Sequence, residues 1–97
     1  GENVWPTPVE QALSTHPAVA EAAVVGVADP QWGQRVVAVV VPTDPGSPPT
    51  LESLRDHVKA SLPAFSAPRE LRLRDRLPRT NLGKVQRSVL RVDGAPQ

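Results

Sequence analysis

Two stretches of the chain are almost continuously apolar. Residues 19–27 and 35–41 consist mainly of Val and Ala and lack a strict alternation of polar and apolar positions. Such runs are typical of central strands that other elements cover on both faces. We therefore predict two strands at these positions, joined by the turn segment 29–34, which carries Trp32.

Capping residues predict a first helix near the start of the chain. Thr7 can cap this helix, Pro8 suits its first position, and Glu10, three residues after Thr7, completes a capping box. Pro17 disfavours helical geometry at the residue before it, so we expect the helix to end before this proline.

The second half of the chain contains two more helical segments and one alternating segment. Thr50 is the expected cap of a helix that continues to Leu62 with apolar residues at helical spacing. Residues 71–77 alternate arginines with leucines and one aspartate, which is the pattern of an edge strand with one wet face. A loop at 78–83 leads to a short amphipathic helix at 85–92. This order predicts an α+β fold, a small domain with a three-stranded sheet packed by about three helices.

Length and composition fit a single domain that occupies residues 1–97. A chain of 97 residues with 39% apolar residues holds one compact core and little else. No apolar run approaches the roughly 18 residues of a membrane helix, and no basic-then-apolar leader opens the sequence. The absence of cysteine excludes disulfides, thiolate zinc sites and cysteine nucleophiles, and fits a reducing compartment. We therefore expect a cytoplasmic protein with no membrane partner.

Positive charge is concentrated in the last quarter of the chain. Residues 1–68 carry three basic and seven acidic side chains, whereas residues 69–91 carry eight basic and two acidic ones. This region is either an anion-binding surface or a solvated charged face. A nucleic-acid module would place aromatic side chains among the arginines, and there are none, so we expect no nucleic-acid partner. A structural, partner-binding module stays open for the chain by itself.

Self-contained catalytic sites are excluded on spacing. Gly83 and Lys84 are followed by Val85 and have no glycine five residues before them, so they do not form a phosphate-binding P-loop. His16 and His57 lie far apart with no carboxylate at metal-ligand spacing, and we interpret both as ordinary histidines without a metal. No serine has the surroundings of a nucleophile elbow.

One segment combines several residues that indicate a function only when they are considered together. Residues 77–87, LPRTNLGKVQR, place a lysine at the tip of a Gly-containing loop just before a helix. With GENVWP at 1–6, HP at 16–17 and VVG at 24–26, this segment strongly resembles the C-terminal domain of the acyl-CoA synthetases in the adenylate-forming superfamily. The resemblance covers almost the whole chain and rests on the order and spacing of these segments.

The resemblance implies a role in an acid–CoA ligase. In that superfamily a large N-terminal domain binds ATP and a carboxylic acid, and the small C-terminal domain turns between an adenylating and a thioester-forming orientation. ATP with Mg²⁺ and CoA are then substrates, and AMP and diphosphate are products. Lys84 matches the catalytic lysine of the family, whose ammonium contacts the carboxylate and the α-phosphate where negative charge grows in the transition state.

The same resemblance implies a channel for CoA. Gly1, Glu2 and Trp32 match positions that line the pantetheine arm, where a glycine backbone and a flat ring let the thiol pass closely. Phe65 matches an aromatic side chain that abuts the adenine.

The phosphate contacts of CoA depart from the family pattern. Related ligases commonly have a basic residue after the aromatic one, where this chain has Ser66 and Ala67. Arg69 follows the next proline and could meet the phosphates instead, with Arg72 as a second candidate. The opening residues 1–3 favour CoA, and a carrier protein stays as the alternative acceptor.

Residues that would hold ATP or the acid belong to the large domain in this superfamily. We therefore expect that the chain binds no cofactor by itself, is inactive alone, and has the N-terminal domain of the same enzyme as its partner. The acid stays open between medium and long fatty acids and aryl acids such as the o-succinylbenzoate of menaquinone synthesis.

Overall fold

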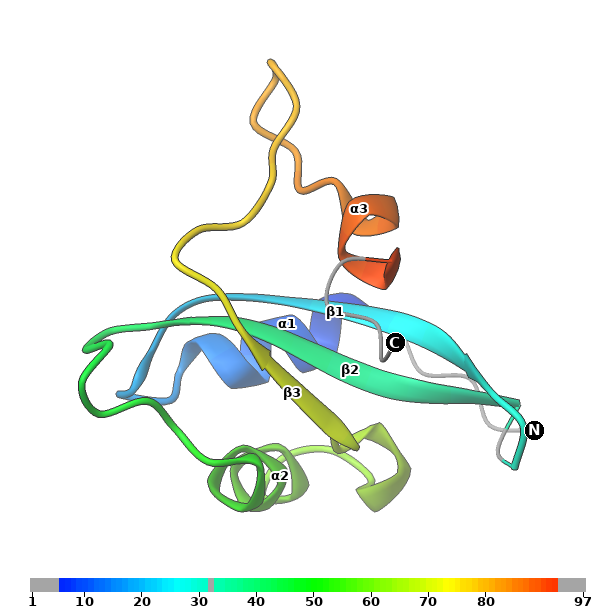
Figure 1. Ribbon diagram of the computed structural model, residues 1–97. Helices are drawn as coiled ribbons and strands as arrows, with labels where there is room; N and C mark the ends of the chain where they lie inside the picture. Colours follow the sequence, from blue (N-terminus) through cyan, green and yellow to red (C-terminus); the bar gives the residue numbers. More distant parts are fainter. Residues whose placement is uncertain (1–5, 32, 93–97) are drawn as a thin grey trace.

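The structure, a computed structural model, describes residues 6–31 and 33–92 and places one sheet between two layers (Figure 1). Its elements are α1 (Pro6–Ser14), β1 (Val19–Asp29), β2 (Gly33–Pro42), α2 (Leu51–Lys59), the 3-10 helix η1 (Ala64–Ser66), β3 (Glu70–Leu73) and α3 (Arg87–Val92). Within the described residues these are three α-helices and a three-stranded sheet, which confirms the predicted α+β fold.

The central strand of the sheet is β2. It pairs antiparallel with β1 and parallel with β3, in the order β1-β2-β3. The expectation of two central strands is therefore wrong for β1, which lies at an edge. Its continuous apolar run has a different reason, because other elements cover both of its faces. The prediction of an edge position is confirmed for β3.

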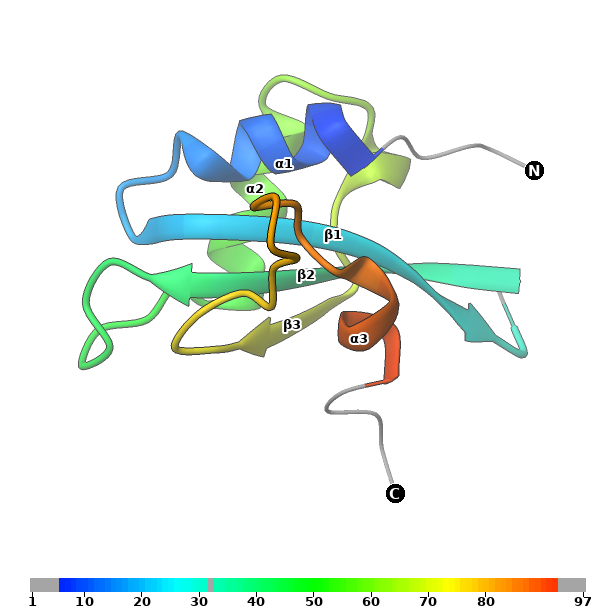
Figure 2. The same cartoon turned by 90° about the horizontal axis from the view of Figure 1, so that it is seen from above.

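One face of the sheet is covered by α1 and α2. Val9 and Leu13 of α1 and Leu54 and Val58 of α2 are buried in one cluster with side chains of β1 and β2. Figure 2 shows α1 running alongside β1. In this layer, residues from the start of the chain pack against residues from its middle.

The chain after β3 covers the opposite face. Leu77 and Leu90 are buried there against alternate residues of β1 and β2. Figure 1 shows α3 and the loop before it above the sheet, with α2 below it. Leu77, the predicted last residue of the third strand, is therefore a core residue that follows the strand, because β3 ends at Leu73.

Element boundaries agree with the sequence where local chemistry decides them. The Thr50 hydroxyl accepts the Ser53 N–H at 3.1 Å, which confirms Thr50 as the cap of α2. The α2 helix ends at Lys59 rather than Leu62, and α3 begins at Arg87 rather than Val85.

The capping box predicted for the first helix is wrong. Because α1 begins at Pro6, Thr7 already lies inside the helix. The Glu10 carboxylate turns to the sheet instead and accepts the Val24 N–H at 2.7 Å. α1 does end before Pro17, as expected. None of the helices in the described part of the chain combines the length and the apolar character needed to cross a membrane.

Candidate functional site

The residues around Lys84 form a short hairpin. Arg79 and Val85 make an antiparallel bridge, and the Thr80 N–H donates to the Lys84 carbonyl at 2.8 Å. Below them the Gln86 N–H donates to the Pro78 carbonyl at 2.9 Å. We call residues 78–86 the Lys84 hairpin. Figure 1 shows it rising away from the sheet beside α3.

The tip of the Lys84 hairpin is closed by Thr80 and Gly83. The Gly83 N–H donates to the Thr80 carbonyl at 2.9 Å, and the Thr80 hydroxyl accepts the N–H groups of Leu82 at 3.3 Å and Lys84 at 3.2 Å. Gly83 has a φ of 86°, in the left-handed region that favours glycine. The positive φ therefore favours glycine at position 83, and the turn fixes the backbone from which the lysine projects.

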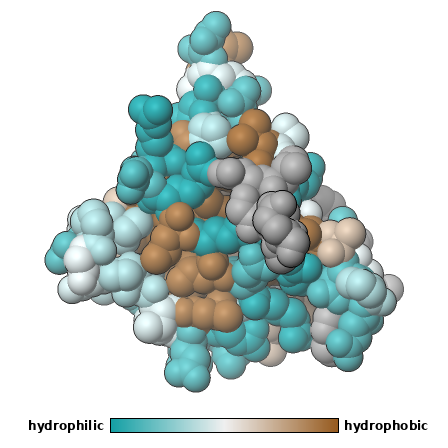
Figure 3. All heavy atoms as spheres, viewed as in Figure 1, coloured by the Kyte–Doolittle hydropathy of each residue, from teal (hydrophilic) through white to brown (hydrophobic). Residues whose placement is uncertain are grey.

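Lys84 is exposed on this raised tip. Among residues 6–31 and 33–92, no carboxylate lies within ion-pair distance of its ammonium group. Figure 3 shows the raised loop as mainly hydrophilic with a small apolar patch, and Leu82, 88% exposed, belongs to the same tip. The geometry presents a cation to whatever faces the end of the hairpin.

Two arginines anchor the hairpin to the first part of the chain. Arg79 pairs with Glu21 of β1 through Nη2, and its Nη1 donates to the Gly83 carbonyl at 2.9 Å. Arg87 pairs with Glu10 of α1, with Nη2 at 2.7 Å from both carboxylate oxygens. One anchor thus holds each end of the hairpin.

Ion pairs also bear on how the basic region at residues 69–91 is interpreted. Arg72, Arg79 and Arg87 are all paired with glutamates, two of which come from the acidic first part of the chain. At least three of the eight basic side chains of residues 69–91 are therefore engaged in intramolecular ion pairs. The spacing of 58 and 77 residues between Glu21 and Arg79 and between Glu10 and Arg87 gives no sequence signal for either pair.

The candidate CoA residues fall into two groups. Gly1, Glu2 and Trp32 lie outside the described residues. Phe65 is 43% exposed in η1, and Arg69 is exposed at the entry to β3, where its N–H donates to the Val36 carbonyl at 2.8 Å. Phe65 and Arg69 thus lie four residues apart on one surface segment before β3, whereas the Lys84 hairpin follows β3.

Arg72, the second arginine considered for the phosphates, has a structural position. Only 10% of its side chain is exposed; Nε pairs with Glu70 and Nη1 donates to the Leu90 carbonyl at 3.0 Å. Burial raises the pKa of the Glu70 carboxyl, but hydrogen bonds and charge from Arg72 and Arg35 outweigh it and hold that pKa below its ordinary value. We therefore assign Arg72 to the packing of α3 on β3.

His16 and His57, separate in sequence, lie together in space. Their rings meet edge to face with centroids 5.0 Å apart. The Nδ1 of His16 accepts the Ala18 N–H at 3.0 Å, and its Nε2 lies 2.8 Å from the Ser53 hydroxyl. Burial, and then the charge of His57, lowers the pKa of His16. The pair joins the residues that follow α1 to α2, so two histidines that lie far apart in sequence are neighbours in the fold.

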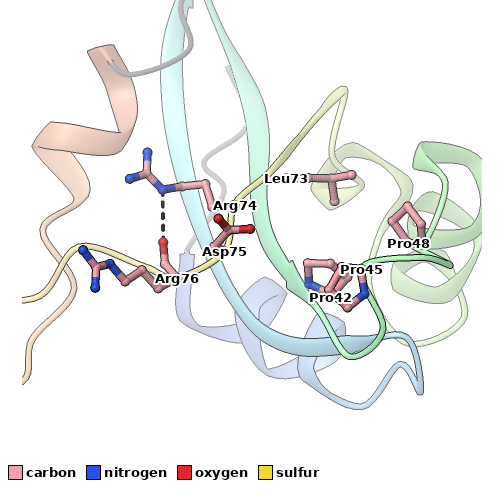
Figure 4. A pocket seen from close by; sticks show the side chains of 7 residues that line it. All are labelled: Pro42, Pro45, Pro48, Leu73, Arg74, Asp75 and Arg76. Carbon is pink, nitrogen blue, oxygen red and sulfur yellow. Dashed lines mark hydrogen bonds between the residues drawn. The ribbon is translucent and has the colours of Figure 1, made fainter.

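No group of three or more His, Cys, Asp or Glu side chains within the described ranges could hold a metal ion. A cavity of about 420 Å³ lies between three prolines of segment 42–48 and residues 73–76 (Figure 4). Its lining includes neither Lys84 nor Phe65 nor Arg69.

Several known proteins are similar to this chain in sequence or in structure. A fatty acid–[acyl-carrier-protein] ligase, ScoC of Streptomyces coeruleorubidus, is 42% identical over 94% of this chain and 17% of its own length. The crystal structure of a Brucella canis acyl-CoA synthetase superposes with a TM-score of 0.82 at 48% identity, over 90% of this chain and 16% of that one.

A higher identity is found with a probable 2-succinylbenzoate–CoA ligase of Mycobacterium tuberculosis, 54% over 93% of this chain. The chain spans about a quarter of that relative, 24% of its length. Residues 8–84 match the family described as the AMP-binding enzyme C-terminal domain, and that match ends on the lysine at the hairpin tip. The chain belongs to this family of C-terminal domains.

Proposed function

We propose that this chain is the C-terminal domain of an ATP-dependent acid–CoA ligase and that Lys84 is its catalytic residue in the adenylation step. The observation that carries the proposal is the position of Lys84. Its ammonium lies exposed on a raised hairpin, without a carboxylate partner among the described residues, while the neighbouring arginines are paired. A lysine that served only solubility would not need a tip closed by a positive-φ glycine and held by two anchors.

The proposed chemistry has two steps. The carboxylate of the acid attacks the α-phosphorus of ATP, which forms an acyl-adenylate and releases diphosphate. The thiol of CoA then attacks the acyl carbon, which forms the thioester and releases AMP. Negative charge grows on the α-phosphate oxygens in the first step, and a positioned ammonium stabilises it there.

Lys84 would enter the site on the hairpin, which the domain delivers as a unit. The large domain that would bind ATP and the acid corresponds to the part of the relatives beyond this chain. We propose that it is the partner of the face that carries the Lys84 hairpin, and that Mg²⁺ accompanies ATP in that domain. We also propose a cytoplasmic location, because the absence of cysteine fits a reducing compartment.

Phe65 and Arg69 would hold the nucleotide end of CoA. The exposed ring of Phe65 offers a face on which the adenine can stack, and Arg69, four residues later, has a guanidinium suited to phosphate. Gly1, Glu2 and Trp32 remain the proposed lining for the pantetheine arm.

A carrier protein is the second candidate acceptor, and the similarity to ScoC supports it. Among acids, 2-succinylbenzoate is the first to test, because the relative at 54% identity is named for it. The test uses the longer protein with ATP, each acid, and either CoA or an acyl-carrier protein. We expect AMP release with a thioester on CoA. A thioester formed only on the carrier protein would favour the second candidate, and no acyl-adenylate with any acid would contradict the ligase.

A further inference from the structure

The tip of the Lys84 hairpin has little packing of its own, whereas Val85 below it packs against the cluster that contains Leu77 and Leu90. The apolar side chain at the tip, Leu82, is 88% exposed, and Lys84 and Asn81 are exposed beside it. Within the described residues the tip is closed by backbone bonds and the Thr80 hydroxyl. A short two-stranded hairpin is marginally stable in water by itself, so something outside the tip must hold it.

Arg79, near the base of the hairpin, contacts both the tip and the body of the domain. Its Nη1 donates to the Gly83 carbonyl at 2.9 Å, and its Nη2 pairs with Glu21. The carbonyl that it holds precedes Lys84 directly in the chain. One planar guanidinium therefore links a carboxylate on β1 to the backbone from which the lysine projects.

The position of Glu21 on β1 follows from strand alternation. Glu21 stands opposite Val41 of β2, and Val41 packs on the face that α3 covers. Its side chain therefore points to the face over which the hairpin rises. With 41% of its side chain exposed, Glu21 contributes little to the core, and an exposed ion pair of this kind adds little global stability.

We propose that Glu21 is a positioning residue for Lys84, acting through Arg79. Glu21 holds the Arg79 guanidinium in the one orientation that also reaches the Gly83 carbonyl, and the hairpin tip is thereby kept in the shape that presents the lysine. Glu10 and Arg87 anchor the other end, but Glu10 also binds the Val24 N–H, so its loss disturbs the fold as well. The proposal rests on the proposed function of Lys84.

Amide hydrogen exchange in the full chain tests the structural part. In Glu21→Ala we expect the exchange of the Thr80 and Gly83 amides to rise about tenfold, because both close the tip. The amides of β2 should be unchanged, which shows that the fold is intact. The matched control is Glu52→Ala, which removes an exposed glutamate from the first turn of α2. Unchanged exchange at Thr80 and Gly83 in Glu21→Ala would overturn the proposal.

Exchanging the two charges separates the ion pair from the link to the tip. In Glu21→Arg with Arg79→Glu the pair can form again, but a glutamate at position 79 cannot donate to the Gly83 carbonyl. We expect the urea midpoint to stay close to that of the unchanged chain, because the exposed pair adds little global stability, while the exchange of the Thr80 and Gly83 amides stays fast. Restored protection at the tip would mean that the ion pair alone suffices, and would overturn the role of Arg79 as the link.

The longer protein tests the positioning role itself. We expect Glu21→Ala to lower kcat for ATP–diphosphate exchange about tenfold at unchanged KM for ATP, and to have no further effect when Lys84→Ala is already present. An equal effect with and without Lys84 would overturn the proposal. If Lys84→Ala leaves adenylation intact, the proposed function fails, whereas a lost adenylation in Lys84→Ala with an unmoved tip in Glu21→Ala overturns only the inference.

Discussion

The Glu10 carboxylate of α1 and the Arg87 guanidinium at the start of α3 meet across the free edge of β1. Their bidentate contact has Nη2 of Arg87 at 2.7 Å from both carboxylate oxygens, and Oε2 also accepts the Val24 N–H. α1 and α3 lie on opposite faces of the sheet, so this contact joins the two layers. It also occupies a backbone donor on the edge of β1, where an unpaired N–H would be open to another strand.

Removing this junction should cost global stability. In Glu10→Ala the Val24 N–H and the Arg87 guanidinium both lose their charged partner in a position where only 17% of the Glu10 side chain is exposed. Hydrogen bonds to charged groups contribute about 1.5–3 kcal/mol, so we expect a loss of about 2 kcal/mol. Urea unfolding of Glu10→Ala and of the exposed control Glu52→Ala measures it. Equal midpoints for the two variants would show that the junction does not stabilise the fold.

The histidine pair predicts a stability that falls in mild acid. Because the pKa of His16 is lowered in the folded chain, the unfolded chain binds a proton first as the pH falls below about 6.5. The stability from neutral His16 is thus present above pH 6.5 and is lost as the pH falls toward the lowered pKa. Protonation also removes the acceptor at Nδ1 that binds the Ala18 N–H.

A variant that cannot titrate separates this effect from other acid effects. His16→Asn can still accept the Ala18 N–H, since an asparagine side chain commonly binds the backbone two residues on. We expect its unfolding free energy to change less between pH 7.5 and pH 5.5 than that of the unchanged chain. The same slope in both proteins would mean that His16 does not control stability in this range. The carboxyl of Glu70, whose pKa is also lowered, acts only at lower pH, below about its ordinary 4.5.

Phe65 should matter for one substrate only. Stacking of a base on an aromatic side chain contributes about 1–3 kcal/mol, so Phe65→Ala in the longer protein should raise KM for CoA by about tenfold. KM for ATP in the adenylation step should be unchanged. Leu73→Ala, which removes an apolar side chain of similar exposure, 47% against 43%, is the control. A rise in KM for ATP as large as that for CoA would contradict the assignment.

Local chemistry made parts of the fold predictable. The cap at Thr50, the end of α1 before Pro17 and the tip glycine at Gly83 each depend on a few neighbouring residues, and the structure has them where the sequence indicates. The apolar runs of β1 and β2 also identified strands covered on both faces, because a strand that is buried on both faces has apolar residues at consecutive positions.

The contacts that hold the candidate site could not be predicted in the same way. Glu10 fits a capping box by spacing, but the structure gives its carboxylate to Val24 and Arg87, partners 14 and 77 residues away. Arg79 and Glu21 likewise meet only because β1 turns one face to the later hairpin. Sequence reasoning singled out Lys84 as the candidate catalytic residue but did not find the contacts that hold its hairpin, since ion pairs between distant segments leave no periodic pattern.

The half-reactions of the longer protein test the role of Lys84 most directly. Lys84→Ala should lower ATP–diphosphate exchange by about 100-fold or more, the effect of losing a donor to transition-state charge, and should leave thioester formation from a supplied acyl-adenylate within about twofold. Lys59→Ala, which changes the other lysine of the chain, should leave both rates unchanged. Equal losses in both half-reactions for Lys84→Ala, or no loss in either, would contradict the account.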